Sequence, residues 1–335
     1  MNQKLLLSFV ALAAFFAWAG CNKSGKLNAP SHFTTPTGPV ELKLKWPAGE
    51  RVVQDFDMKQ TTEINVPGQP APTKQNLAMG QKYALTVLNQ DAAGGHEVEM
   101  EFLSARMTVG MGGKTVLDYD SAKPAVADKQ NPVAGVFNEV VGSKIQFFLD
   151  ASNNVERLEG MDDLVNRLST GNQGPAANSV KSMFNEGYFK QMMSANWFLP
   201  SKPVQPGDTW PAHMELPMTG MGTMTLDYNV TFKSWEMHGK RNCARLEFDG
   251  TIKLKPEATP APNGLNLSIP EGNTSGVSWF DPELGIVIDS AVNQDMTVIM
   301  TLPGNPQAGA GAAGQGMTLT NQTSQTINIK LDSVK

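Results

Sequence analysis

The stretch Glu97-Val98-Glu99-Met100-Glu101-Phe102 decides the fold class of this chain. Apolar residues alternate with glutamates, which is the period of a β-strand with one face buried and the other in water. A helix would scatter the glutamates around its axis instead. The stretch therefore predicts a half-buried strand in an antiparallel sheet.

The same alternation returns along most of the chain. It recurs in residues 41–46, 77–87, 226–232, 244–248 and 326–332. Between such runs, Asp91–Gly95 and His238–Lys240 predict hairpin turns. The glycine-rich Gly110–Lys114 lacks the spacing of a phosphate loop and predicts another hairpin tip. We therefore expect a mainly β (α+β) fold built from one or more large, curved antiparallel sheets.

The middle of the chain changes to a helical period. Gly160-Met161-Asp162-Asp163 predicts the start of a short helix, because aspartates suit a helix N-terminus. Gly174-Pro175 predicts the start of a longer helix that ends near Trp197. These helices would be inserted between two β-rich halves, residues 41–200 and 201–335, which we expect to form one structural unit.

The two predicted halves share local features. Tyr83 and Tyr228 each lie in an alternating strand, and Asp150 and Asp281 each precede a turn that an aspartate can cap. A duplication is one interpretation, and recurrent hairpin chemistry is the other.

Three segments show no period of either kind. Residues 22–39 predict a flexible tether, residues 256–276 a surface loop, and residues 303–316 a disordered segment rich in glycine and alanine.

The N-terminus has the pattern of an export signal. Lys4 precedes an apolar run from Leu5 to Ala19, which is shorter than the roughly 20 residues of a membrane-spanning helix. The run ends in small residues directly before Cys21. The pattern predicts a signal peptide over residues 1–20, cleaved before Cys21.

The string Ala17-Trp18-Ala19-Gly20-Cys21 resembles the lipobox of bacterial lipoproteins. The resemblance implies a diacylglycerol on the Cys21 thiol and a further acyl chain, such as palmitate, on its amine. It also implies an exported, membrane-anchored protein on the periplasmic or outer-membrane face. Trp18 departs from the pattern, which usually has an aliphatic residue there. The alternative is an ordinary secretory signal with a chance cysteine. If Cys21 is lipidated, Cys243 has no disulfide partner.

Several short motifs together resemble an uncharacterised family of bacterial exported lipoproteins, a domain of unknown function. They are Leu42-Lys43-Leu44 with Gly49-Glu50, Gly80-x-x-Tyr83, Tyr119-Asp120-Ser121, the segment Asp150–Gly160 and Pro206-Gly207-Asp208-Thr209-Trp210. This resemblance implies class and location but no mechanism. The order of elements is also similar to that of lipoprotein-carrier half-barrels, in which a curved sheet holds acyl chains.

Charge and motif content argue against several classes of function. The net charge of −5 argues against nucleic acid as a partner. The four histidines show no His-x3-His spacing, and Gly-x-Ser-x-Gly is absent. Asp118 and Asp120 share one strand face, where solvated charges are commoner than a cation site or an acid–base pair. We therefore expect no enzymatic activity, no cofactor and no metal.

Methionine is the most unusual local feature. Met214, Met218, Met221 and Met224 lie close together, and thioethers can hold copper(I). On a continuous strand, however, Met221 points away from the other three. The favoured interpretation is an adaptable apolar lining, because methionine fills irregular spaces. We expect Met214, Met218, Met224 and Tyr228 to line an apolar pocket.

The expected function is that of a cell-envelope lipoprotein that binds an apolar ligand or lipid. The alternative is a structural or protein-interaction lipoprotein of the envelope, and copper(I) binding or hydrolysis rank below both. The expected partners are the membrane, through lipidated Cys21, a lipid or other apolar ligand, and an envelope protein.

Overall fold

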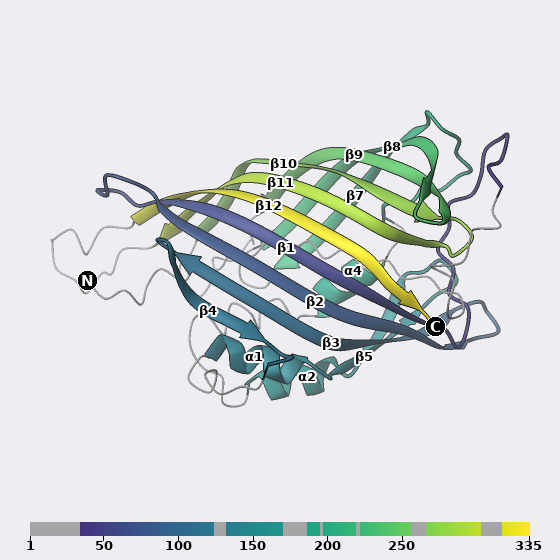
Figure 1. The fold of residues 1–335 in the computed structure, drawn as a ribbon, viewed down its shortest axis with the longest axis horizontal. Helices are drawn as coiled ribbons and strands as arrows, with labels where there is room; N and C mark the ends of the chain where they lie inside the picture. Colours follow the sequence, from purple (N-terminus) through teal and green to yellow (C-terminus); the bar gives the residue numbers. More distant parts are fainter. Residues whose placement is uncertain are drawn as a thin grey trace.

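The computed structural model describes residues 34–123, 132–169, 186–194, 197–218, 222–255, 266–302 and 317–335. These residues form one 12-stranded antiparallel sheet, shown in Figure 1. The strands are β1 Arg51–Asn65, β2 Thr73–Gln90, β3 His96–Met111, β4 Lys114–Asp120, β5 Lys144–Leu149, β6 Val155–Glu159, β7 Thr209–Met218, β8 Gly222–His238, β9 Arg241–Lys255, β10 Asn266–Asp281, β11 Ile286–Leu302 and β12 Met317–Val334. The predicted antiparallel architecture is confirmed.

The first and last strands meet in the middle of the sheet. The order is β6-β5-β3-β2-β1-β12-β11-β10-β9-β8-β7, and β4 pairs with β3 outside this path. Each half is largely a run of sequential hairpins, and the halves join where β1 pairs with β12 over the whole of β1 from Val52 onward. The two β-rich halves therefore share one continuous sheet.

Within the described residues, three short helices accompany the sheet: α1 Pro132–Val140, α2 Met161–Ser169 and α4 Glu186–Met193. The helix predicted to begin around Met161 is confirmed as α2. The described part of the second predicted helix is α4, and residues 170–185 lie outside the described residues. Sequence reasoning missed α1, whose first turn has no acidic residue. Its N-terminal proline is compatible with the first position of a helix.

Helix α4 packs against both β6 and β7, the two ends of the strand order. A sheet whose two ends meet one helix must curve round it, and Figure 1 shows the strands arched above the helices. The helix also covers edges that would otherwise present unpaired backbone groups.

The curved sheet has a buried inner face and a largely exposed outer face. In β1, for example, Phe56 and Met58 are buried on the inner face, whereas Lys59 is exposed on the outer one. Buried apolar residues of eleven strands and of α1, α2 and α4 belong to one core cluster, and the partly buried Val155 and Leu158 of β6 pack against it. Period-two alternation in the sequence therefore becomes a single packed core.

Several local predictions can be compared with the structure. The hairpins at Asp91–Gly95, Gly112–Gly113 and Gly239 are confirmed, with glycines in the left-handed region in all three. Regular backbone pairing starts at Val40, which exchanges two hydrogen bonds with Val204.

The surface loop predicted over residues 256–276 is wrong in its second part. Strand β10 begins at Asn266, and its pairing with β11 is irregular between Ser268 and Glu271. Pro270 lies in this irregularity, and a proline cannot donate a ladder hydrogen bond, so the strand signal was masked. Residues 256–265 and 303–316 lie outside the described residues.

Candidate functional site

A row of polar side chains crosses the inner face of the sheet. Strand register places Gln60 of β1 opposite Gln325 of β12, and Gln325 opposite Gln294 of β11. Gln294 in turn lies opposite Thr274 of β10. All four side chains are buried. We call this row, continued below, the inner polar belt.

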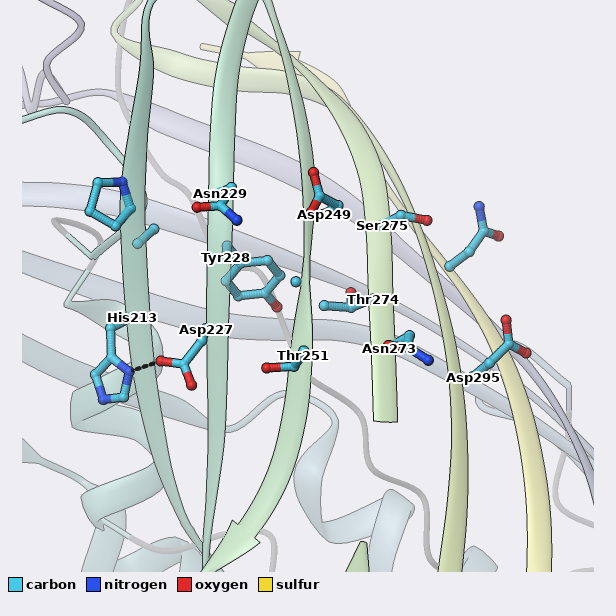
Figure 2. Close-up of a pocket in the computed structure, with 14 residues that line it drawn as sticks. His213, Asp227, Tyr228, Asn229, Asp249, Thr251, Asn273, Thr274, Ser275 and Asp295 are labelled. Carbon is cyan, nitrogen blue, oxygen red and sulfur yellow. Dashed lines mark hydrogen bonds and ion pairs between the residues drawn. The ribbon is translucent and has the colours of Figure 1, made fainter. Parts of the chain in front are cut away.

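The belt continues to β8 through a position without a side chain. Thr274 pairs with Gly250 of β9, and Gly250 pairs with Tyr228 of β8. A Cβ at Gly250 would lie 2.2 Å from the backbone oxygen of Asp227, so β8 and β9 approach too closely for any larger residue. The tyrosine and the threonine thus flank an inner-face position without a side chain. Figure 2 shows the Tyr228 hydroxyl pointing toward Thr274.

On one side of the sheet, side-chain contacts at the belt link β1 to β12. Gln60 Nε2 donates to Thr62 Oγ1 at 3.0 Å, and the Thr62 and Thr323 hydroxyls lie 3.2 Å apart across β1 and β12. These residues connect the two halves of the chain through side chains as well as backbone.

The other side of the belt is less fully bonded. The buried Tyr228 and Thr274 hydroxyls, each 3% exposed, interact with each other. Gln294 Nε2 on β11 and Asn321 Oδ1 on β12 are buried and have no hydrogen-bond partner. Leaving a buried polar group unpaired costs about 1–3 kcal/mol, so these two atoms call for an explanation.

Burial keeps the belt uncharged. It raises the pKa of the Tyr228 hydroxyl above its ordinary value, and the neighbouring Thr274 hydroxyl opposes this shift only in part. The Tyr228 hydroxyl is therefore protonated at any physiological pH. The remaining belt side chains are amides and hydroxyls, which carry no charge.

Aromatic side chains surround Tyr228. Its ring centroid lies 5.6 Å from that of Trp197 and 5.7 Å from that of Phe248. Trp210 Nε1 donates to the backbone oxygen of Phe198 at 2.8 Å, which ties the segment after α4 to β7. These aromatic contacts hold the Tyr228 ring in place.

Apolar side chains of different kinds flank the belt within β7 to β12. On one side, toward the turns that join β8 to β9 and β10 to β11, phenylalanines are buried: Phe232, Phe248 and Phe280. On the other side the inner face is rich in methionine: Met214, Met224, Met296 and Met300. We call this second surface the methionine zone.

Two of the predicted pocket methionines lie in this zone. Met214 and Met224 are buried on the same face as Tyr228, on the paired strands β7 and β8. Met218 ends β7, but its side chain lies outside what the structure describes, as does the whole of Met221. The sequence argument for a shared face thus agrees with the positions of Met214, Met224 and Tyr228. That these residues line a pocket stays a prediction.

The outer face behind the belt has a groove of about 750 Å³, drawn in Figure 2. Short polar side chains from β7 to β11 line it, including Asp227, Asp249, Asn273 and Asp295. His213 Nδ1 lies 2.7 Å from Asp227 Oδ1. The groove is exposed and hydrophilic, so its surface side chains can be satisfied by water, and Tyr228, Gly250 and Thr274 of the belt are also among the residues that line it.

Other side chains singled out in the sequence take structural roles. Asp118 Oδ1 accepts a hydrogen bond from Thr108, and Asp120 Oδ1 accepts one from the backbone of Ala122. Cys243 is a buried free thiol. Among the described residues, no group of three or more histidine, cysteine or acidic side chains could hold a metal ion. Cys21 lies outside the described residues.

Fold and site together define an open, curved antiparallel-sheet protein with a polar row buried inside it. The chain belongs to the family of unknown function DUF6263, whose family model matches residues 93–287, more than half of the chain. The prediction of an uncharacterised family is confirmed to that extent. A comparison with curated proteins finds no match.

Solved structures show only distant likeness. A structure on lipid–protein interactions in lipovitellin is 10% identical with a TM-score of 0.42, and the match covers 86% of this chain but only 26% of that one. DynF from the dynemicin biosynthesis pathway of Micromonospora chersina is 9% identical with a TM-score of 0.20, covering 92% and 91%. A putative outer membrane lipoprotein-sorting protein domain from Vibrio parahaemolyticus is 8% identical with a TM-score of 0.11, covering 85% of each chain. Likeness at this level carries no argument about function.

Within the part of the chain that the structure describes, no helix is long and apolar enough to span a membrane.

Proposed function

We propose that this protein is a non-enzymatic binding module that holds a lipid or another largely apolar molecule against the inner face of its curved sheet. The observation that carries the proposal is that two buried amide atoms of the inner face, Gln294 Nε2 and Asn321 Oδ1, have no hydrogen-bond partner. Such atoms are costly in a finished core, and a bound molecule would give them partners.

The methionine zone supports the same proposal. Methionine side chains are flexible and polarizable, and they are overused at surfaces that adapt to several apolar partners. A protein that only had to be stable would gain from branched residues with fewer rotamers at these positions.

We further propose that the protein is exported and anchored in the cell envelope through lipid on Cys21. The signal pattern of residues 1–20 and the lipobox-like string that ends in Cys21 support this. Replacing Cys21 with serine should move the protein from the membrane fraction to the soluble fraction. A Cys21→Ser protein that still sediments with membranes would contradict the proposal.

Binding can be tested with the neutral apolar dye N-phenyl-1-naphthylamine and the full chain. We expect a saturable rise in fluorescence that Thr274→Trp abolishes, because the ring would fill the belt. Thr251→Trp is the matched control: Thr251 lies on the neighbouring strand β9 but is exposed on the outer face. No saturable uptake by the wild-type protein, or equal uptake by both variants, would contradict the proposal.

A second candidate is contact with another envelope protein, and the outer groove is the observation that favours it. A photo-crosslinking residue placed at Asn273 should then capture one reproducible partner in cells, whereas the same residue at exposed Val116 of β4 should not. Identical capture patterns at both positions would exclude the groove as the contact.

A further inference from the structure

The turn between β8 and β9 presents the most exposed large apolar side chain among the described residues. Met237 is 65% exposed, and the next most exposed, Val116, is 50% exposed. Lys240 is exposed in the same turn. A single exposed apolar side chain is ordinary on a protein surface, so the neighbours of Met237 decide what it can bind.

Two half-buried tryptophans lie close to this turn. The ring of Trp235 packs on Phe232 with centroids 5.0 Å apart, and Trp279 of β10 stacks on His238 with centroids 4.4 Å apart. Tryptophan is enriched at the boundary between membrane and water, because its ring is apolar and carries one polar N–H group. A lysine beside them can keep its ammonium at the level of the lipid phosphates. The turn thus has the composition of a membrane-interface contact.

Contacts from two neighbouring strands hold the turn in shape. His238 Nε2 lies 3.0 Å from Asp289 Oδ2 of β11, and Trp279 Nε1 of β10 donates to Glu236 Oε2 at 3.3 Å. Met237 is therefore presented by a fixed hairpin rather than by a loose loop. A contact made by a pre-organised element loses little conformational freedom on binding.

The N-terminal segment of the described chain lies beside the same turn. Asn242 of β9 lies opposite Met237 in the strand register, and Asn242 Nδ2 donates to Thr35 Oγ1 at 2.9 Å. Further along this segment, Lys45 Nζ donates to the backbone oxygen of Pro282 at 2.7 Å, in the turn between β10 and β11. The segment is thus fixed to the end of the sheet at which the C-terminus lies, on the right of Figure 1.

The distance along the chain from this contact to Cys21 is short. Thr35 lies 14 residues after Cys21. A flexible chain of that length spans about 20 Å on average and at most roughly 50 Å. Lipid on Cys21 would therefore keep the Met237 turn close to the bilayer. Such tethering raises the effective concentration of the turn at the lipid surface, so that even a weak contact becomes populated.

We propose that the β8–β9 turn docks on the lipid bilayer, with Met237 inserted at the interface and Lys240 at the level of the phosphates. This inference rests on the proposed lipid anchor at Cys21. It adds a second point of membrane contact and an orientation, in which the end of the sheet that carries this turn faces the membrane.

The test uses the full, lipid-anchored chain in vesicles of phosphatidylethanolamine and phosphatidylglycerol. The environment-sensitive dye NBD is attached to Met237→Cys, and the unlabelled wild-type protein is the blank because Cys243 is buried. We expect the emission to rise several-fold on transfer to vesicles and to be quenched by spin-labelled lipid, because the interface excludes water from an inserted group. Val116→Cys on β4 is the matched control, since it is exposed near the β3–β4 turn at the opposite end of the sheet, and its emission should not change.

A pair of charge reversals tests the position of the lysine. In the protein labelled at residue 237, Lys240→Glu should weaken quenching about threefold or more, because it places a negative charge against an anionic surface. Lys114→Glu, exposed at the start of β4, is the control and should leave quenching unchanged. Thermal unfolding checks that each variant is folded.

The outcomes separate this proposal from the lipid anchor. Equal signals from labels at residues 237 and 116 would overturn the docking while leaving the anchor at Cys21 standing. A label at residue 237 that is already shielded from water before vesicles are added would show that the chain itself covers Met237, and would also overturn the docking. Equal quenching in the two glutamate variants would overturn the placement of Lys240 at the phosphates. A protein that does not remain with the vesicles at all would contradict both the docking and the anchor.

Discussion

Tyr83 and Tyr228 occupy comparable places in the two halves of the chain and differ in one respect. Each lies on the second strand of its half, each ring is buried on the inner face, and burial raises the pKa of each hydroxyl. The Tyr83 hydroxyl, however, donates to Gln54 on the adjacent strand, whereas the Tyr228 hydroxyl interacts with Thr274 two strands away, across Gly250. The comparison shows that the same buried tyrosine links neighbouring strands in one half and spans a glycine position in the other.

The turns capped by Asp150 and Asp281 also differ between the two halves, and here the residue of the C-terminal half is the more strongly bonded one. Asp150 Oδ1 accepts hydrogen bonds from the backbone of Ser152 and Asn154 in an exposed turn. Asp281 caps its turn in the same way but is fully buried and also pairs with Arg241. The turn of the C-terminal half thus contains a buried ion pair, whereas the turn of the N-terminal half is held by hydrogen bonds at the surface.

The largest expected effect on stability tests the comparison between the Asp281 and Asp150 turns. Asp281→Ala should lower the free energy of unfolding by about 3–5 kcal/mol, because it leaves the Arg241 guanidinium buried without its main partner. Asp150→Ala should lower it by much less, since that turn faces solvent. Urea unfolding of the two variants measures both values. Equal losses would show that the buried ion pair adds nothing to the turn.

The next largest effect on stability tests the comparison between Tyr83 and Tyr228. Tyr83→Phe should lower the free energy of unfolding by about 1–2 kcal/mol because it removes a buried hydrogen bond. Tyr228→Phe should lower it by less, because the interaction of its hydroxyl with Thr274 falls short of the regular geometry of the Tyr83–Gln54 bond. Equal losses in the two variants would show that both hydroxyls are bonded equally well.

A smaller effect is expected where the belt crosses β10. Thr274→Val replaces a buried hydroxyl that interacts with Tyr228 by a methyl group of similar shape, so stability should change by less than about 1 kcal/mol. Ser290→Ala is the control on β11, because the Ser278 and Ser290 hydroxyls lie 2.8 Å apart and are paired. That variant should be destabilised. If Thr274→Val were the less stable of the two, the hydroxyl would be part of the folded core.

The smallest expected effect is on the stability of the protein at acidic pH. Hydrogen bonds from the Asn154 side chain and backbone and from the Ser152 backbone lower the pKa of Asp150 below its ordinary value of 3.8. This carboxylate therefore contributes stability above that value, and the contribution is lost as the pH falls from 3.8 through the lowered pKa. Asp150→Asn should make the acid-side fall in stability slightly shallower there, measured by thermal unfolding from pH 5 to pH 2. An unchanged slope would argue against the cap.

The alternation of apolar and polar residues was enough to predict the sheet and one of its faces. Segments such as 97–102 leave no other regular structure that buries one side. The turns at Gly112–Gly113 and Asp150 followed from residue chemistry alone. Helix α1 did not, because its nine residues carry no acidic residue in the first turn and no basic residue in the last.

The belt could not be predicted from the sequence, for a physical reason. In Asn321–Gln325 every residue is polar, so period two gives no contrast between the faces. The belt also depends on register between strands far apart in the chain, such as Gln60 and Gln325. Only Tyr228 and its neighbouring methionines carried a signal, and that signal indicated an apolar lining rather than a row of hydrogen-bonding groups.

The most direct test of the account is the mass of the full chain, purified without harsh detergent, by native mass spectrometry, followed by organic extraction of the same sample. The account predicts a wild-type mass above that of the processed chain and an extracted lipid or other largely apolar molecule that explains the difference. A clean ligand-free mass for the wild-type protein, with nothing in the extract, would contradict it.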